Sequence, residues 1–216
     1  MRLKHNIQGR LYQAEVDQCL LEQLRVMNFP VESGEGELDE GYRLLEKCLC
    51  SCGTEMITDL VVDYERVFVG VGNYDGKVAC PYESAYTIPE RLIMERDQNE
   101  VVAAYRVEVV DKMEGQNIWE DHISLELEFM AYLCQETRDA IGDRDWNEII
   151  GSLIDQIDFL IHHLTNWIPA FCADMEKCAE THFYRAVAKI TKGFLQLERA
   201  TLEDFILKAV NEMATN

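Results

Sequence analysis

Residues 145–164 carry the pattern that most constrains what this chain can fold into. Apolar side chains recur there every three or four positions, which is the spacing of one face of an α-helix: Ile149, Ile150, Leu153, Ile154, Ile157, Leu160, Ile161 and Leu164. Similar stripes run through 12–27, 183–194 and 202–209. With only 4 prolines in 216 residues, little interrupts long helices. We therefore predict an all-α helical bundle with no β-sheet of three or more strands.

The chain length and its apolar content of 48% suit one domain with a real core, or one domain with a weak internal division. We predict a single all-helical domain over residues 1–216, in which residues 1–53 carry the least recognisable pattern. Further helices are expected near 39–50 and from about 54 to 68, the latter with Thr54 as its N-cap.

Two segments have the composition of loops. Residues 31–41 combine glycines with several acids, and residues 69–90 form the longest helix-poor stretch. The second segment holds Gly70, Gly72, Gly76, Pro81 and Pro89. Because binding residues often lie on loops, we expect 69–90 to be a functional segment. Residues 101–110 are ambiguous between helix and strand, and we assign them as helix.

The charge balance narrows the classes of partner. Asp and Glu number 40 against 20 Lys and Arg, which gives a net charge of −20. This charge repels nucleic acids and anionic membranes and attracts basic segments, although it could also serve solubility alone. No apolar run approaches the ~20 residues of a membrane span, and residues 1–6 lack the apolar stretch of a secretory signal. We therefore expect a cytoplasmic protein without stable membrane insertion, whose 8 cysteines are reduced thiols.

A polar pair interrupts the apolar surface of the predicted helix over 121–134. Apolar side chains fill an arc of roughly 220° on this helix, yet His122 and Glu126 fall in the middle of the arc, one turn apart. Burying ionisable groups is costly unless they find partners. Such a pair could neutralise itself and shift both pKa values, which makes it a site candidate. The alternative is a structural pair that ties the preceding loop to the bundle.

Three sequence blocks resemble one known family. The segment 120–133, EDHISLELEFMAYL, resembles the signature helix of the TorD/DmsD/NarJ superfamily of redox-enzyme maturation chaperones, E-P-D-D-H-x-x-x-E-L-x-F-M-x-x-L. Residues 64–70 followed by 81–86 resemble its Y-x-x-L-F-x-G and P-x-E-S-x-Y elements. A third block resembles F-x-x-x-H-L-x-x-W-x-P-x-F: Phe159, His163, Leu164, Trp167, Pro169 and Phe171. The blocks occur in the family's order over about residues 55–197.

The resemblance implies an all-α, non-enzymatic cytoplasmic chaperone without a cofactor. Such a protein binds the twin-arginine signal peptide, or the apo form, of a molybdenum oxidoreductase and holds it back from export until its cofactor is in place. The peptide-binding positions carried over from the family are Tyr64, Val67, Phe68, Pro81, Asp121 and His122. We add Tyr82, Glu83 and Glu126 from the same motifs, since a leader needs carboxylates for its guanidinium groups and an apolar groove for the rest. Plain core packing is the alternative for the aromatic residues. The client and the oligomeric state stay open.

A second class of function rests on the cysteine run over 48–52. Cys48, Cys50 and Cys52 could make a metal- or redox-responsive protein. On a helix, however, the first and third share a face while Cys50 points almost opposite, so joint binding of one ion requires the helix to unwind. We therefore expect no metal site. A hydrolase using His122 and Glu126 lacks a nucleophile motif, and His162 and His163 diverge on a helix and look like helix-end residues.

Overall fold

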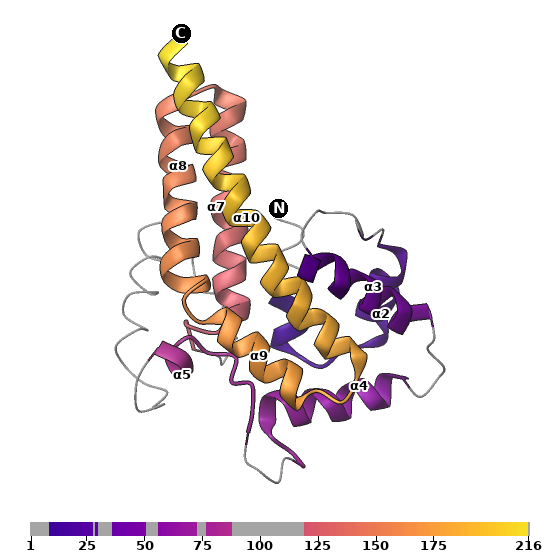
Figure 1. Ribbon diagram of the computed structural model, residues 1–216. Helices are drawn as coiled ribbons and strands as arrows, with labels where there is room; N and C mark the ends of the chain where they lie inside the picture. The colour runs from indigo at the N-terminus through magenta and orange to yellow at the C-terminus, as the bar shows by residue number, and fades with distance from the viewer. Residues whose placement is uncertain are drawn as a thin grey trace. The chain divides into compact units, whose positions relative to one another are not determined.

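Every regular element in the part of the chain that the computed structural model describes is a helix (Figure 1). The described residues are 9–27, 29, 36–50, 56–72, 77–87 and 119–215. The elements are α2 (Gln18–Val26), α3 (Gly36–Cys50), α4 (Met56–Tyr64), η1 (Glu65–Val69), α5 (Ser84–Thr87), α7 (Ile123–Asp143), α8 (Trp146–Phe159), η2 (Leu160–Leu164), α9 (Ile168–Cys178) and α10 (His182–Thr215). Residues 9–13 are also helical, and Tyr82 forms an isolated antiparallel bridge with His122. The predicted all-α fold is confirmed for these ranges.

The chain divides into two compact units. Unit 1 comprises Met1–Tyr12, Tyr82–Trp167 and Leu197–Asn216, and unit 2 comprises Gln13–Pro81 and Ile168–Gln196. The helix α10 contributes its first part to unit 2 and its last part to unit 1. The single domain expected over 1–216 stays a prediction.

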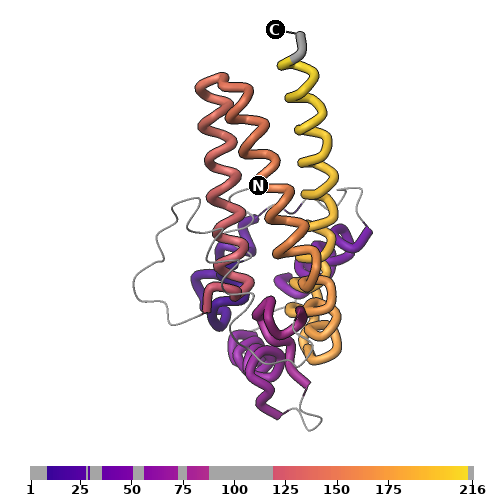
Figure 2. Tube along the Cα trace, turned by 90° about the vertical axis from the view of Figure 1, so that its left-hand side faces the viewer, coloured from indigo at the N-terminus to yellow at the C-terminus, as the bar shows by residue number. Residues whose placement is uncertain are grey.

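A helical hairpin of α7 and α8 forms the frame of unit 1. The helix α7 ends at Arg144, whose backbone is left-handed (φ 59°, ψ 32°), and α8 begins after Asp145. The Asp145 carboxylate accepts the backbone N–H groups of Asn147 (3.0 Å) and Glu148 (3.2 Å), so it caps the start of α8. A connection this short places the two helices antiparallel and side by side, as Figures 1 and 2 show.

The core of unit 1 lies between α7, α8 and η2. Phe129 of α7 meets Phe159 of α8 edge to face, with ring centroids 4.7 Å apart. Leu127 and Met130 of α7 and Leu160 of η2 are fully buried. Burial of each such side chain contributes roughly 1.5–3 kcal/mol. The start of α7, which carries the polar motif residues, is therefore held in place by its apolar neighbours.

In unit 2, two glycines let α3 pack closely against the first part of α10. A Cβ atom on Gly193 of α10 would lie 2.5 Å from the backbone nitrogen of Leu38. A Cβ atom on Gly41 of α3 would lie 2.8 Å from the backbone nitrogen of Ile190. Both distances are shorter than real Cβ contacts, so larger residues here would force the two helices apart.

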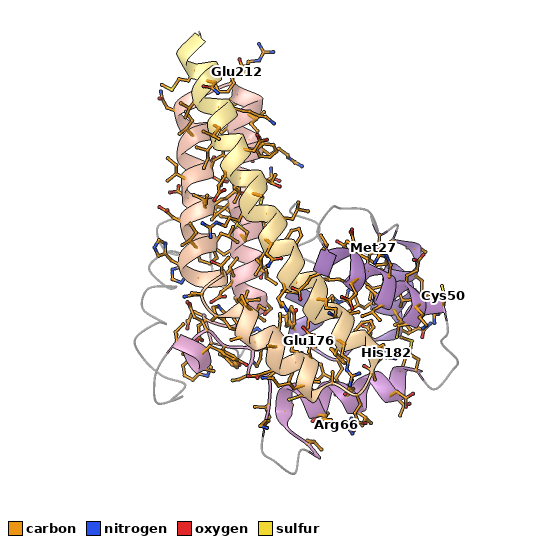
Figure 3. The ribbon with its side chains drawn as sticks, viewed as in Figure 1. Met27, Cys50, Arg66, Glu176, His182 and Glu212 are labelled. Carbon is orange, nitrogen blue, oxygen red and sulfur yellow. The ribbon has the colours of Figure 1, made fainter. Side chains whose placement is uncertain are left out.

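The buried carboxylate of Asp63 ties the end of α4 to the turn before α10 within unit 2. It accepts the backbone N–H groups of Glu180 (2.9 Å) and Thr181 (2.8 Å) and the hydroxyl group of Thr181. Arg66, labelled in Figure 3, adds ion pairs to Asp63 (3.5 Å) and Glu180 (2.6 Å). These contacts fix the α4–η1 segment, which carries the motif aromatics.

The segments η1 and η2 are π-helical turns of five residues that continue α4 and α8. Such turns are rare and often occur at functional sites. The first ends at Gly70, whose backbone is left-handed (φ 87°) and where a Cβ would lie 2.6 Å from Cγ1 of Val78. Both π-helical turns coincide with blocks of the recognised family pattern.

Two sequence-predicted boundaries are wrong. The stripe over 12–27 is not one helix, because the chain leaves the helix after residue 13 and α2 starts only after Asp17. The Asp17 carboxylate accepts the N–H of Leu20 (2.6 Å), which begins a new helix there. The predicted loop over 31–41 is helical from Gly36 onward, where acidic residues in the first turn favour the start of α3.

Other sequence expectations agree with the structure or fall outside it. The predicted helices near 39–50 and from about 54 to 68 are confirmed as α3 and as α4 with η1. Within 69–90, the described residues hold one short helix, α5, as expected for a helix-poor segment. The proposed N-cap Thr54 and the segment 101–110 lie outside the described residues.

Candidate functional site

Three carboxyl groups of unit 1 form a buried cluster, which we call the carboxylate cluster: Glu83, Asp121 and Glu126. Their residues are 3%, 0% and 0% exposed. Glu83 precedes α5, Asp121 precedes α7, and Glu126 lies in the first turn of α7. The bridge between Tyr82 and His122, with a 3.0 Å hydrogen bond from the Glu83 N–H to the Asp121 carbonyl, joins these distant segments.

The Glu83 carboxylate is fixed by two side chains from the end of η2 and the turn that follows it. Its Oε2 lies 3.2 Å from Nδ1 of His163, and its Oε1 accepts a 3.0 Å hydrogen bond from Nδ2 of Asn166. Asn166 also donates to the carbonyl of His162. Both oxygens of Glu83 are therefore engaged, and the residue anchors the 82–87 segment to the α8–η2 side of unit 1.

Asp121 forms a second contact between the start of α7 and the 82–87 segment. Its Oδ2 accepts the backbone N–H of Ser84 at 3.2 Å, whereas its Oδ1 is buried without a hydrogen-bond partner among the described residues. Burial raises the pKa of Asp121; hydrogen bonds from Ser84 oppose this effect, and the charge of Glu83 adds to it. Asp121 therefore offers one unused acceptor.

Glu126 is the most perturbed acid of the carboxylate cluster. Its Oε2 accepts a 3.2 Å hydrogen bond from Nε1 of Trp167, which also donates to the His163 carbonyl at 2.6 Å. Its Oε1 accepts no hydrogen bond in the part of the chain described, and in its protonated form the carboxyl group hydrogen-bonds to Glu83. Burial raises the pKa of Glu126 well above its ordinary value, and the charges of Glu83 and Asp121 raise it further. Glu126 therefore keeps its proton to a higher pH than an exposed glutamate.

His122 serves as the N-cap of α7. Its Nδ1 accepts the backbone N–H of Ser124 at 3.1 Å and lies 2.7 Å from the Ser124 hydroxyl oxygen. Its ring meets that of Tyr82 edge to face at 4.9 Å. Burial lowers the pKa of His122 to about 4, so the ring is neutral near pH 7. The expected self-neutralising pair with Glu126 is therefore wrong, because His122 turns to Ser124 and Glu126 turns to Trp167.

The candidates in unit 2 form a separate aromatic group around η1. Tyr64 and Phe68 are half-buried, with ring centroids 4.9 Å apart. Phe68 packs against the buried rings of Tyr184 (5.7 Å) and Phe171 (6.2 Å). Val67 is fully buried, which agrees with the core-packing alternative for that position. Pro81, the last residue of unit 2 before Tyr82, is buried as well.

The structure thus brings five of the nine predicted residues together in unit 1: Tyr82, Glu83, Asp121, His122 and Glu126. His163, Asn166 and Trp167, whose side chains contact the carboxylate cluster, are not among the predicted site residues. Their spacing of three and four positions was the available signal, because it places three side chains on one helical face. His163 lies in the last turn of η2, as predicted, but that position alone did not show that its side chain meets Glu83.

The cysteine run lies at the end of α3. Cys48 is half-buried and Cys50 is exposed, and neither forms a disulfide bond among the residues described, while Cys52 falls outside them. Among the residues described, no group of three or more His, Cys, Asp or Glu side chains is arranged to hold a metal ion. Within the same residues, no helix has the length and apolar character needed to cross a membrane.

Comparisons with known proteins identify relatives of the chain. Each of the three relatives described here is named chaperone protein TorD. The protein from Vibrio cholerae serotype O1 (strain ATCC 39541) is 28% identical over 153 residues, 68% of this chain and 64% of that protein. The one from Aliivibrio salmonicida is 27% identical over 146 residues, covering 65% and 62%. The one from Aliivibrio fischeri is 28% identical over 167 residues, covering 74% and 72%. The match thus spans somewhat less than two thirds of the V. cholerae relative's length.

A family model described as nitrate reductase delta subunit matches residues 35–173, which is more than half of the chain. This range contains all nine candidate residues and the carboxylate cluster. Together with the TorD relatives, it confirms the resemblance found in the three motif blocks. The chain therefore belongs to the nitrate reductase delta subunit family, within the group of TorD- and NarJ-like maturation chaperones.

Proposed function

We propose that the protein is a non-catalytic, cytoplasmic chaperone for a molybdenum oxidoreductase. It binds the twin-arginine signal peptide of its client, the apo form of the enzyme, or both, and assists maturation before export. The names of its relatives as chaperones and the match to the nitrate reductase delta subunit family support this proposal. The three motif blocks, in order along the chain, support it as well.

The carboxylate cluster is the observation that carries the proposal. A guanidinium group offers five N–H donors in a planar fork and binds best to carboxylate oxygens with unused acceptor capacity. Oδ1 of Asp121 and Oε1 of Glu126 are two such oxygens in one buried cluster, among the residues described. The net charge of −20 would draw the basic end of a leader toward the chain.

Access to these oxygens requires a local movement. Because Asp121 and Glu126 are fully buried, a guanidinium group reaches them only after a local movement, and we propose that the 82–87 segment moves because it contacts Asp121 and His122. That segment is held by the Tyr82–His122 bridge and by the hydrogen bonds from Glu83 and Ser84 to Asp121. A peptide that supplies new hydrogen bonds to Asp121 would replace the one lost from Ser84. Leader binding would therefore open this segment.

The aromatic group of unit 2 suits the apolar part of a leader. Tyr64 and Phe68 leave part of their rings accessible while their other sides pack on Tyr184 and Phe171. Rigid, partly exposed aromatic rings are typical anchors for a bound peptide. The buried Val67 would support this surface rather than contact the peptide.

Leader binding should depend on pH and on the guanidinium group. A bound guanidinium favours ionised Asp121 and Glu126, whose pKa values are raised in the free protein, so binding releases protons and strengthens as the pH rises. Calorimetry with synthetic leaders from the molybdenum oxidoreductases of the source organism tests this. A twin-arginine leader should bind about tenfold tighter than its twin-lysine copy, because lysine lacks the planar fork. Equal binding of both peptides, or no binding of any leader, would contradict the proposal.

The alternative function is a metal- or redox-responsive protein that uses the cysteines of the 48–52 run. Metal analysis of the purified protein separates the two functions. A stoichiometric metal ion that is lost when Cys48, Cys50 and Cys52 are changed to serine would favour the alternative.

A further inference from the structure

A groove lies in unit 1 between α7, α8 and the last part of α10, away from the carboxylate cluster. It has a volume of about 1100 Å³ and is lined mainly by apolar side chains, among them Ile141, Trp146, Leu153, Leu202 and Phe205. On α10 the lining continues to Glu212, which is labelled near the C-terminal end of that helix in Figure 3. None of the residues that line this groove belongs to the site proposed above for the leader.

The dimensions and exposure of the groove fit a helix better than a small molecule. The lining on α10 extends from Leu202 to Glu212, ten positions or about 15 Å of helix. The volume exceeds that of most small-molecule pockets. Ile141 is 56% exposed and Phe205 is 44% exposed, so large apolar surfaces at the groove are left in contact with water. An amphipathic helix would cover them with its apolar face.

The charge of the groove is opposite to that of the chain. Its lining contains Arg138, Arg144 and Lys208 against the single acid Glu212, whereas the chain as a whole carries −20. Lys208 pairs with Asp204 at 2.5 Å. In the part of the chain that the structure describes, neither arginine side chain forms an ion pair. The groove therefore presents two unpaired guanidinium groups beside an apolar surface.

The backbone of Arg144 is a second unusual feature of the groove. Arg144 is the one residue other than glycine with a positive φ among the described residues. Glycine is the usual residue in this conformation at the end of a helix, and a side chain there costs roughly 1 kcal/mol. The hairpin thus keeps an arginine at the groove where glycine would be less strained.

We propose that this groove docks an amphipathic helix of a partner protein, with its apolar face between the three helices and its Asp or Glu side chains on Arg138 and Arg144. Charge-assisted pairs of this kind are the strongest that surface arginines form. The basic end of a twin-arginine leader would be repelled here. The groove is therefore a second docking site with the opposite charge preference, and it does not depend on leader binding.

Two matched peptides test the charge preference. One is a synthetic helical peptide with a leucine face flanked by glutamates, and the other has lysines in place of the glutamates. The net charge of −20 alone favours the lysine peptide. The groove predicts that the glutamate peptide binds about tenfold tighter when fluorescence anisotropy is measured on the full chain. Tighter binding of the lysine peptide, equal binding, or no binding of either would overturn the proposal.

Matched variants locate the binding. Changing both Arg138 and Arg144 to glutamine should abolish the preference, while Arg199→Gln, an exposed arginine outside the groove lining, should retain it. Phe205→Ala should weaken the binding of the glutamate peptide about tenfold, whereas Leu207→Ala, an exposed residue of the same helix outside the groove lining, should leave it unchanged. Thermal melts check that all four variants are folded. If the four variants bind alike, the peptide sits elsewhere and the proposal fails.

Other occupants of the groove are outcomes of the same experiments. One alternative occupant is a fatty acid such as laurate, which has an apolar chain and a carboxylate as the glutamate peptide does. The other is a second copy of the chain, which could cover the exposed apolar side chains of the groove. Laurate that binds in a manner sensitive to Arg138 and Arg144, without binding of the glutamate peptide, would overturn the proposal. Sedimentation velocity that shows dimers lost on Phe205→Ala would overturn it as well.

Discussion

Replacing Glu126 with glutamine tests the electrostatics of the carboxylate cluster while almost preserving its shape. Glu126 is fully buried, and one of its oxygens accepts the Trp167 indole N–H. A glutamine keeps an oxygen for that bond and never carries a charge. Any pH dependence that belongs to Glu126 should therefore disappear from the variant.

The raised pKa of Glu126 decides whether stability rises or falls with pH. The folded protein keeps the Glu126 proton to a higher pH than the unfolded chain, whose pKa is near the ordinary 4.5. This contribution to stability is complete below the unfolded pKa and is lost as the pH rises from there through the folded pKa. The loss is at most about 1.4 kcal/mol per pH unit. As the pH increases, the unfolding free energy of the variant should therefore rise relative to that of the wild type by up to about 1.4 kcal/mol per pH unit.

Urea unfolding at pH 5, 6, 7 and 8, followed by circular dichroism, measures this difference. Asp121 titrates in both proteins, so the difference between the two curves reports the titration of Glu126 together with its coupling to Asp121 and Glu83. Glu128→Gln, on the same helix but outside the carboxylate cluster, controls for the removal of one carboxyl group. If the stability curves of wild type and Glu126→Gln run parallel from pH 5 to 8, the electrostatic account of the cluster is incorrect.

Three further predictions concern the histidine cap, the helix contact and the cysteines. His122→Asn keeps an N-cap side chain but removes an imidazole whose pKa is lowered from 6.5 in the unfolded chain to about 4 in the folded protein. The wild type should therefore lose up to about 3 kcal/mol of unfolding free energy as the pH drops from 6.5 to 4, and the variant should not. Urea unfolding between pH 4 and 7 that shows equal losses would refute this. Gly193→Ala should lower the stability by about 1–3 kcal/mol, measured by thermal melts, because the added Cβ meets the backbone of Leu38. Gly142→Ala, whose Cβ would meet open space, should be neutral or stabilising. Equal effects of the two changes would contradict the close contact at Gly193. Changing the three cysteines within 48–52 to serine should leave leader affinity unchanged, and loss of affinity with a normal melt would assign them a role in binding.

The frame of unit 1 could be predicted from sequence because its determinants are local. The apolar stripe over 145–164 gives α8 and η2, and Asp145 marks the start of that helix by its own capping bonds. The motif around 120–133 likewise predicted the first half of α7. The break after residue 13 was missed because Asp17 caps a helix inside a continuous apolar stripe.

The partners within the candidate site could not be predicted, because they depend on distant contacts. His163 lies 80 positions from Glu83, and a helical pattern shows which residues share a face without showing what that face meets. The pairing of His122 with Glu126 failed for a local reason. His122 is the N-cap with an extended backbone (φ −74°, ψ 133°), so the helical wheel that placed it one turn from Glu126 does not apply.

The affinity of a twin-arginine leader for Asp121→Asn tests the central claim most directly. Asparagine keeps an oxygen for the Ser84 N–H but removes the charge that would bind a guanidinium group. Calorimetry should show a loss of about 1–3 kcal/mol, or roughly 5- to 150-fold, in a component that is sensitive to salt. Asp139→Asn, which changes an exposed acid of α7, is the control and should bind like wild type. If Asp121→Asn binds the leader as tightly as wild type while melting normally, Asp121 is structural and the leader binds elsewhere.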